Sequence, residues 1–320
     1  MRKNDDLKLN ISEKESTAIY CVALVVALAL SYLILLAPEG NPQTLLNYAV
    51  TQISYLVVPF AFLKLRGYNY SAIVPIKTKV NPIGLMLTIP IAIGAFLQNT
   101  IISVLFNNLL SLIGITPSIT LPLTDTPVNI ILAILTVVIL PATAEEFLFR
   151  GVMTAAYKES GVMKACALSA LIFALSHFNP AQIVHQFILG FLLAVTVMTT
   201  GSIWYAVIIH LINNLIALFI GDIIPAFNNL AVLNGTNILI LLAMCIVGAI
   251  ILIVSFVAFN RTNAKDNLKI SGNPFRVLSK KHSPAYYVNS GTKITYITIG
   301  FLAFLIVMSI LTALMQGLSL

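Results

Sequence analysis

The chain has 320 residues, of which 59% are hydrophobic and 9% are charged, and its mean hydropathy is +0.97. This composition predicts a polytopic membrane protein, and no polar stretch is long enough to form a separate soluble domain. We attribute the net charge of +7 to the Lys and Arg excess of cytoplasmic membrane loops, and not to nucleic-acid binding.

Apolar runs of about 20 residues match the roughly 30 Å hydrocarbon core of a bilayer. The sequence has nine such runs, at about 17–37, 45–65, 82–113, 128–149, 164–178, 181–200, 203–221, 235–259 and 294–317. They predict an all-α transmembrane bundle of about nine spans. The fifth and sixth runs are short and closely joined, so this pair could also form a re-entrant hairpin.

The basic residues predict the orientation of these spans. Apart from four Lys and Arg before the first span, all of them lie in loops 64–81, 150–164 and 260–293. The intervening loops near 38–44, 114–127 and 222–234 carry none. With nine spans and a cytoplasmic N-terminus, every basic loop is cytoplasmic. We therefore expect this orientation in the cell membrane, with 260–293 as a basic cytoplasmic loop.

The fourth span ends in the stretch Pro141-Ala-Thr-Ala-Glu145-Glu146-Phe-Leu-Phe-Arg150-Gly151. Each carboxylate at mid-bilayer costs on the order of 3 kcal/mol, so two adjacent ones are unusual. Glu146 and Arg150 are four residues apart, which predicts an ion pair near the cytoplasmic interface. Glu145 points about 100° away on a helix. It has no local counter-ion and is a candidate general base.

Histidines supply further candidates, because three of the four lie in spans. His177 closes the fifth span. His210 and Asn214 share one face of the seventh span, which is the arrangement of donors that holds a developing oxyanion. Counted at 1.5 Å per residue, Glu145 and His210 should lie about 8 and 10 Å from the inner surface, and His177 about 20 Å. His177 therefore fits the other residues only if the hairpin is shallow.

Other polar residues in the spans are weaker candidates for catalytic residues. His185 shares a helix face with Gln182 and Gln186, which suggests the wall of a polar cavity. Asn99 and Asn213 are expected to form hydrogen bonds between helices.

The motifs Glu145-Glu146-x-x-x-Arg150, Phe173-x-x-x-His177 and His210-x-x-x-Asn214 resemble the CAAX-protease and bacteriocin-processing family of intramembrane endopeptidases, also called the Abi family. Type II CAAX prenyl endopeptidases are relatives in that family. The resemblance covers roughly spans four to seven. It divides the chain into N-terminal spans (1–127), a catalytic core (128–221) and a C-terminal part (222–320).

The resemblance implies that Glu145, assisted by His177, activates the attacking water. His210 and Asn214 would stabilise the oxyanion, and Glu146 and Arg150 would support and orient the site. Zinc is a possible cofactor, with His177, His210 or Glu145 as ligands, because three protein ligands and a water suffice for a catalytic zinc. The sequence leaves open whether a metal is bound, and it lacks the H-E-x-x-H string.

These expectations describe a peptidase that cuts a membrane-associated peptide near the cytoplasmic leaflet. The substrate would be a bacteriocin or pheromone precursor or a CAAX-type peptide, with the bilayer as the other partner and no nucleic acid. Two non-enzymatic readings stay open. One is an immunity protein that acts by binding a partner, and the other is a proton-coupled transporter that uses Glu145 as a relay.

Overall fold

A computed structural model of the chain describes residues 7–115, 121–263 and 295–318. These residues form an all-α bundle, as the sequence predicts. In these three ranges the only strand-like pairing is an isolated bridge between Lys8 and Tyr68.

The helices correspond in order to the nine predicted spans. They are α1 (Glu13–Ile34), α2 (Asn41–Leu65), α4 (Pro82–Leu112), a composite segment (Pro127–Ser160), α8 (Val162–Leu175), α9 (Pro180–Thr200), α10 (Trp204–Ile223), α11 (Gly235–Asn263) and α13 (Tyr296–Leu318). In the part of the chain that the structure describes, seven helices are long and apolar enough to cross a membrane. The chain is therefore an integral membrane protein. Helix α8 is shorter than these seven.

Side-chain caps explain where several helices begin. Ser12 and Glu15 form a capping box at the start of α1. Asn81 accepts a hydrogen bond from the Ile83 amide at the start of α4, and Asn179 does the same for Ala181 at the start of α9. Each cap pairs a backbone N–H that the first helical turn would otherwise leave without a partner.

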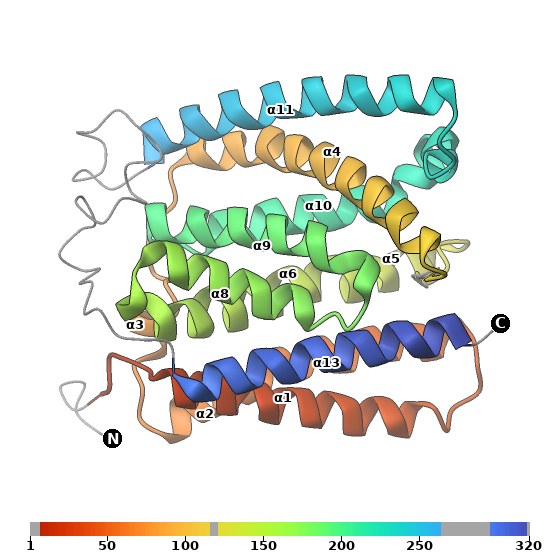
Figure 1. Cartoon of the computed structure of the whole chain (residues 1–320). Coiled ribbons are helices and arrows are strands. Elements are labelled where there is room, and N and C mark those ends of the chain that lie inside the picture. The colour runs from red at the N-terminus through yellow and green to blue at the C-terminus, as the bar shows by residue number, and fades with distance from the viewer. Residues whose placement is uncertain (1–6, 116–120, 264–294, 319–320) are drawn as a thin grey trace.

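The helices run along a common direction and form three groups. Helix α11 lies along α4 on one side, α8, α9 and α10 occupy the middle, and α1, α2 and α13 lie on the other side (Figure 1). Helices α4 and α11 approach closely at two glycines. A Cβ atom on Gly94 would lie 2.8 Å from the Leu252 amide nitrogen, and one on Gly248 would lie 2.8 Å from the Leu97 side chain.

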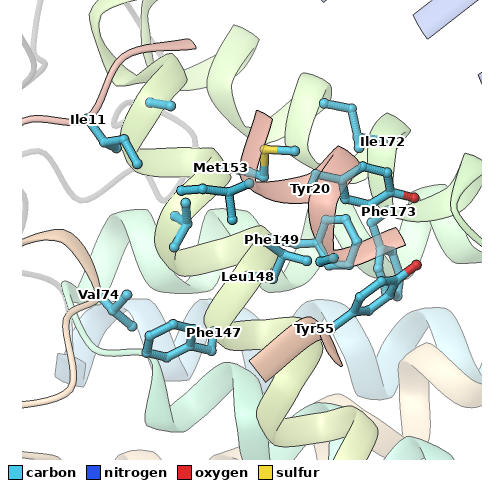
Figure 2. Packing of buried hydrophobic residues seen from close by; sticks show 14 of the residues in the cluster. Ile11, Tyr20, Tyr55, Val74, Phe147, Leu148, Phe149, Met153, Ile172 and Phe173 are labelled. Atoms are coloured by element: carbon cyan, nitrogen blue, oxygen red, sulfur yellow. The ribbon is translucent and has the colours of Figure 1, made fainter. Parts of the chain in front are cut away.

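A cluster of aromatic rings joins the middle group to α1 and α2. Figure 2 shows Tyr20, Tyr55, Phe149 and Phe173 close together, on the right of the view. The Phe149 ring centroid lies 5.9 Å from that of Tyr20, 6.0 Å from that of Tyr55 and 5.2 Å from that of Phe173. All four residues are buried. Because Phe149 lies close after Glu145 and Glu146, this packing fixes the segment that carries the two carboxylates.

That segment is not a regular α-helix. It runs through α5 (Pro127–Ala133), the π-helical η2 (Ile134–Ile139), α6 (Leu140–Glu145), the π-helical η3 (Glu146–Met153), α7 (Thr154–Tyr157) and the short η4 (Lys158–Ser160). The wider turns are supported by side chains. The Phe149 carbonyl accepts hydrogen bonds from the Thr154 hydroxyl at 2.8 Å and from the Ser169 hydroxyl at 2.7 Å. Such π-helical turns occur frequently at functional sites.

The position of Arg150 differs from the sequence expectation. We expected it at the cytoplasmic end of the fourth span, but the helical segment continues to Ser160 and Arg150 is only 1% exposed. The glutamates are therefore deeper in the bundle than expected, with Glu145 about 20 Å from Ser160. Arg150 can lie inside the bundle because Glu146 is its ion-pair partner there.

The basic loops lie at one end of the bundle. The end of α2, the short α3 (Tyr70–Ile73), the start of α4 and the turn before α8 all meet at the end from which α1 starts (Figure 1). This is the arrangement that the charge pattern requires. The predicted basic loop 260–293 falls, from residue 264 onward, outside the described residues.

Candidate active site

A cavity of about 600 Å³ lies among α2, α4, α6, α9 and α10, within the usual range of ligand-binding pockets. Its lining includes Glu145, His177, His210 and Asn214. A second cavity of about 290 Å³ adjoins it, and Glu145 and His177 line both. The structure thus brings four predicted site residues together around one space.

Glu145 is held by an amide that the sequence reading did not select. The residue is 7% exposed, and its Oε1 atom accepts a hydrogen bond of 2.8 Å from Gln52 Nε2 on α2. Its Oε2 atom lies 3.8 Å from His210 Nε2. Gln52 could have been noticed as a polar residue within the apolar second span, but no motif links it to Glu145.

The Glu146 carboxylate contacts both Arg150 and His210. Its Oε1 atom lies 2.7 Å from Arg150 Nη1 and 2.8 Å from His210 Nδ1, and all three side chains are buried. The predicted Glu146–Arg150 ion pair is therefore present. An ionised carboxylate can only accept hydrogen bonds, so His210 Nδ1 donates and Nε2 faces Glu145. The Arg150 guanidinium also lies 4.1 Å from the Phe173 ring centroid, a cation–π distance.

His177 lies in the turn that follows α8. Its Nδ1 atom is 2.9 Å from the Phe173 carbonyl oxygen, which makes Nδ1 the donor and leaves the Nε2 lone pair available. The next residue, Phe178, has a left-handed φ of 47°, and the chain reverses there into α9. Figure 1 shows this turn short of the bundle end that α4 and α11 reach. His177 and Glu145 line the same two cavities.

The Asn214 side chain is hydrogen-bonded to the backbone of the fourth span. Its Nδ2 atom donates to the Val137 carbonyl at 3.2 Å. Pro141, four residues after Val137, has no N–H to offer that oxygen. One hydrogen of the Asn214 amide is used by the Val137 carbonyl, and the second remains for a ligand in the cavity.

Further polar side chains, most of them amides, line the same cavity. Gln182, His185 and Gln186 form part of its wall, as predicted from their shared face. Asn99 and Asn213, which we expected to join helices, line the cavity instead. Each is at most 9% exposed, and Asn99 Nδ2 and Asn213 Oδ1 have no hydrogen-bond partner among the described residues. Their depth alone could not distinguish a cavity wall from a helix contact.

We tested whether the site's residues fit a metal ion. Within the described ranges, no three His, Cys, Asp or Glu side chains are grouped so as to hold one. The Nδ1 atoms of His210 and His177 bond Glu146 and a carbonyl, which leaves their Nε2 atoms and the Glu145 carboxylate as possible donors. These donors do not form the grouping that a metal ion needs. The residues therefore do not fit a three-ligand zinc site, and the mechanism proposed below includes no step through a metal.

Comparison with known proteins gives one finding. Residues 127–216 match the family model described as type II CAAX prenyl endopeptidase Rce1-like. The matched segment contains all six predicted site residues, from Glu145 to Asn214, but not Gln52. The match supports an intramembrane endopeptidase of the CAAX type. Neither the curated proteins nor the solved structures include a match to the chain.

Proposed function

We propose that the protein is an intramembrane endopeptidase that hydrolyses a peptide bond in a membrane-associated peptide, with water activated by Glu145. The observation that carries this proposal is the buried Glu145 carboxylate at the junction of two cavities, beside His177 and His210. Among the described residues this carboxylate has no Arg or Lys partner, and the Gln52 amide positions it, so it is available to accept a proton.

In the first step, a water molecule between Glu145 and His177 attacks the carbonyl carbon of the scissile bond. Its proton passes to the Glu145 carboxylate, and the carbonyl electron pair moves onto oxygen to form an oxyanion. His177 Nε2 accepts a hydrogen bond from the same water and orients it. Glu145 then gives its proton to the departing amine nitrogen, and the carbon–nitrogen bond breaks.

The oxyanion would be stabilised by His210 and Asn214, one turn apart on α10. Asn214 offers its second amide hydrogen. His210 would donate from Nε2 with both ring nitrogens protonated. Glu146 and Arg150 are positioning residues, because they hold His210 in place and do not line the main cavity. Removing one oxyanion donor typically costs about 10²–10³ in kcat.

For substrates we propose membrane-associated peptides, such as bacteriocin or pheromone precursors or CAAX-type peptides. The proposed location is the cell membrane, with the N-terminus cytoplasmic, because the basic helix ends lie at one end of the bundle. The proposed domain division places the catalytic core at 128–221. Gln52 shows that α2, outside that core, also supplies a contact to Glu145.

The direct test is cleavage by the purified protein in liposomes, followed by mass spectrometry in ¹⁸O-labelled water. We expect one ¹⁸O atom in the new carboxyl terminus of the product, and the same rate with and without a strong chelator. The Glu145→Ala protein serves as the control for contaminating proteases. Cleavage that persists in this variant, or that stops with chelator and returns with zinc, would contradict the mechanism.

A further inference from the structure

A separate cavity of about 350 Å³ lies at the basic end of the bundle, where Figure 1 shows α3. Three parts of the chain surround it: α3 with the loop that follows, the segment from η3 to η4, and the C-terminal end of α9. None of the residues that line it also lines either cavity around Glu145. It is therefore a different space from the proposed active site.

The charged residues that line this cavity are all basic. Among the described residues its lining includes Lys77, Arg150 and Lys158 and no Asp or Glu. Because Arg150 is paired with Glu146 at 2.7 Å, the two lysines supply the net positive charge. Lys77 is exposed, and Lys158 Nζ is positioned by a hydrogen bond of 2.8 Å to Asn10 Oδ1. The cavity therefore favours an anionic ligand.

The remaining wall of the cavity is largely apolar. Ile73, Val197 and Met198 are buried, and Ala155 is half-buried. A soluble anion such as phosphate gains nothing from apolar surface, whereas the glycerol and acyl chains of a phospholipid gain free energy by covering it. The lining therefore matches an anion that is joined to an apolar chain.

Trp204 places the cavity at the level of the lipid headgroups. Its side chain is 42% exposed, and its Nε1 atom donates to the Ile76 carbonyl at 2.8 Å. Tryptophan is enriched at membrane–water interfaces. The Ile203 amide also donates to the Pro75 carbonyl at 3.2 Å, so the start of α10 holds the loop that carries Lys77. Basic pockets between membrane helices on the cytoplasmic side bind anionic lipid headgroups.

We propose that this cavity binds an anionic phospholipid of the cytoplasmic leaflet. The phosphate lies between Lys77 and Lys158, and the glycerol and upper acyl chains lie against Val197 and Met198. This inference does not depend on the proposed function. It assigns a lipid site whose wall includes Arg150, the arginine of the buried ion pair.

The test measures lipid binding to the purified full-length protein in detergent micelles by native mass spectrometry. The probes are dioleoylphosphatidylglycerol, dioleoylphosphatidylcholine and inorganic phosphate. The two lipids have the same acyl chains, but only the first has a net charge. We expect tighter binding of phosphatidylglycerol than of phosphatidylcholine. Inorganic phosphate at the same concentration should not displace phosphatidylglycerol, because it makes no apolar contact.

Substitution of the two lysines tests the position of the site. The double variant Lys77→Gln, Lys158→Gln should lower the apparent affinity for phosphatidylglycerol about 25-fold, at about fivefold for each lysine beside an anionic headgroup. Glutamine at position 158 keeps a donor for Asn10. Lys79→Gln is the matched control, because Lys79 is exposed in the same loop but does not line the cavity.

Each contrary outcome has a distinct meaning. Equal affinities for the two lipids, or an equal loss in Lys79→Gln and in the double variant, would overturn the site. Displacement by inorganic phosphate at equal concentration would overturn the assignment to a lipid. If the double variant unfolds, the single variant Lys77→Gln at its exposed position decides. A fivefold loss there supports the proposal, and unchanged affinity contradicts it.

Discussion

Glu145 and Glu146 are neighbours in the chain, yet their surroundings differ. Glu146 is fully buried between Arg150 and His210, at 2.7 and 2.8 Å. Glu145 accepts a hydrogen bond from the Gln52 amide and lines both cavities. Loss of Glu146 should therefore damage the fold first, and loss of Glu145 should damage the proposed chemistry.

The Glu146–Arg150 pair gives a prediction about stability. Glu146→Gln leaves a buried guanidinium without its counter-ion, and breaking such a pair costs about 3–5 kcal/mol. The double variant Glu146→Gln, Arg150→Met removes both charges and should be more stable than Glu146→Gln alone. Thermal unfolding in detergent measures this order. A double variant less stable than both single variants would contradict the account of the pair.

Gln52 gives a prediction about positioning. Gln52→Leu removes the hydrogen bond to Glu145 Oε1 and should lower kcat about tenfold, the kinetic equivalent of ~1.4 kcal/mol, with KM nearly unchanged. Ser54→Ala is a matched control, because Ser54 is buried on α2 and bonds only the Val50 carbonyl of its own helix. Equal effects of the two substitutions on kcat would show that Gln52 acts only through the stability of α2.

The sequence allowed part of this site to be predicted. Glu145, His177, His210 and Asn214 could be selected because each is a polar side chain in an apolar span. Gln52 could not be assigned, because no spacing rule links residues on helices 93 positions apart. Arg150 is buried within the helical segment and not at its end, since a buried ion pair removes the need for an arginine to reach the interface.

At the scale of helices, the close approach of α9 to the catalytic segment depends on Gly190. A Cβ atom there would lie 2.9 Å from Arg150 Nη2, 2.9 Å from the Phe173 ring and 3.3 Å from the Ala170 backbone. All three distances are tighter than ordinary carbon contacts of about 3.5–4.0 Å. Helices α8 and α9 can therefore enclose Arg150 only with glycine at this position.

Gly190→Ala should destabilise the protein by about 1–3 kcal/mol, the usual cost of overpacking a core. Activity should also fall, because the methyl group displaces Arg150 and, through Glu146, His210. Gly300→Ala is the control, since Gly300 also lies inside a helix but nothing lies within 4 Å of an added Cβ. Unfolding midpoints and cleavage rates of both variants check this prediction. A harmless Gly190→Ala would contradict the packing described for α9.

The sequence predicted where the helices are, but not the shape of the fourth one. Long apolar runs identify spans because the bilayer thickness sets their length. The π-helical turn of η3 depends on a tertiary partner, the Ser169 hydroxyl of α8, which donates to the Phe149 carbonyl. The Ser169 contact cannot be predicted from sequence spacing, because it forms only when α8 packs against the segment.

At the scale of the whole molecule, the helices outside the matched segment complete the bundle around it. Helix α11 covers α4 through the close approach at Gly94 and Gly248. Helix α13 packs on α1, with Glu13 Oε2 3.1 Å from the Thr298 hydroxyl and Tyr20 5.2 Å from Phe301 between ring centroids. The last two predicted spans therefore bury the outer faces of α4 and α1.

The charge asymmetry of the bundle gives a prediction about topology. Thr78 lies at the basic end, before α4, and Asp222 lies near the end of α10. Each is replaced by cysteine in a protein freed of its three native cysteines. An impermeant thiol reagent should reach Asp222→Cys in intact cells and Thr78→Cys only in inverted vesicles. Both positions reacting from one side would contradict the crossing pattern and the cytoplasmic N-terminus.

The central claim is that Glu145 activates water in a folded site, and one comparison tests it most directly. Glu145→Gln keeps the shape of the side chain and a hydrogen-bonding partner for Gln52, but it cannot accept the proton of water. We predict that kcat falls by at least about 10²-fold, the lower end of general-base contributions, while the unfolding midpoint stays near that of the wild type. A Glu145→Gln protein that is folded and cleaves peptide at the wild-type rate would contradict the claim.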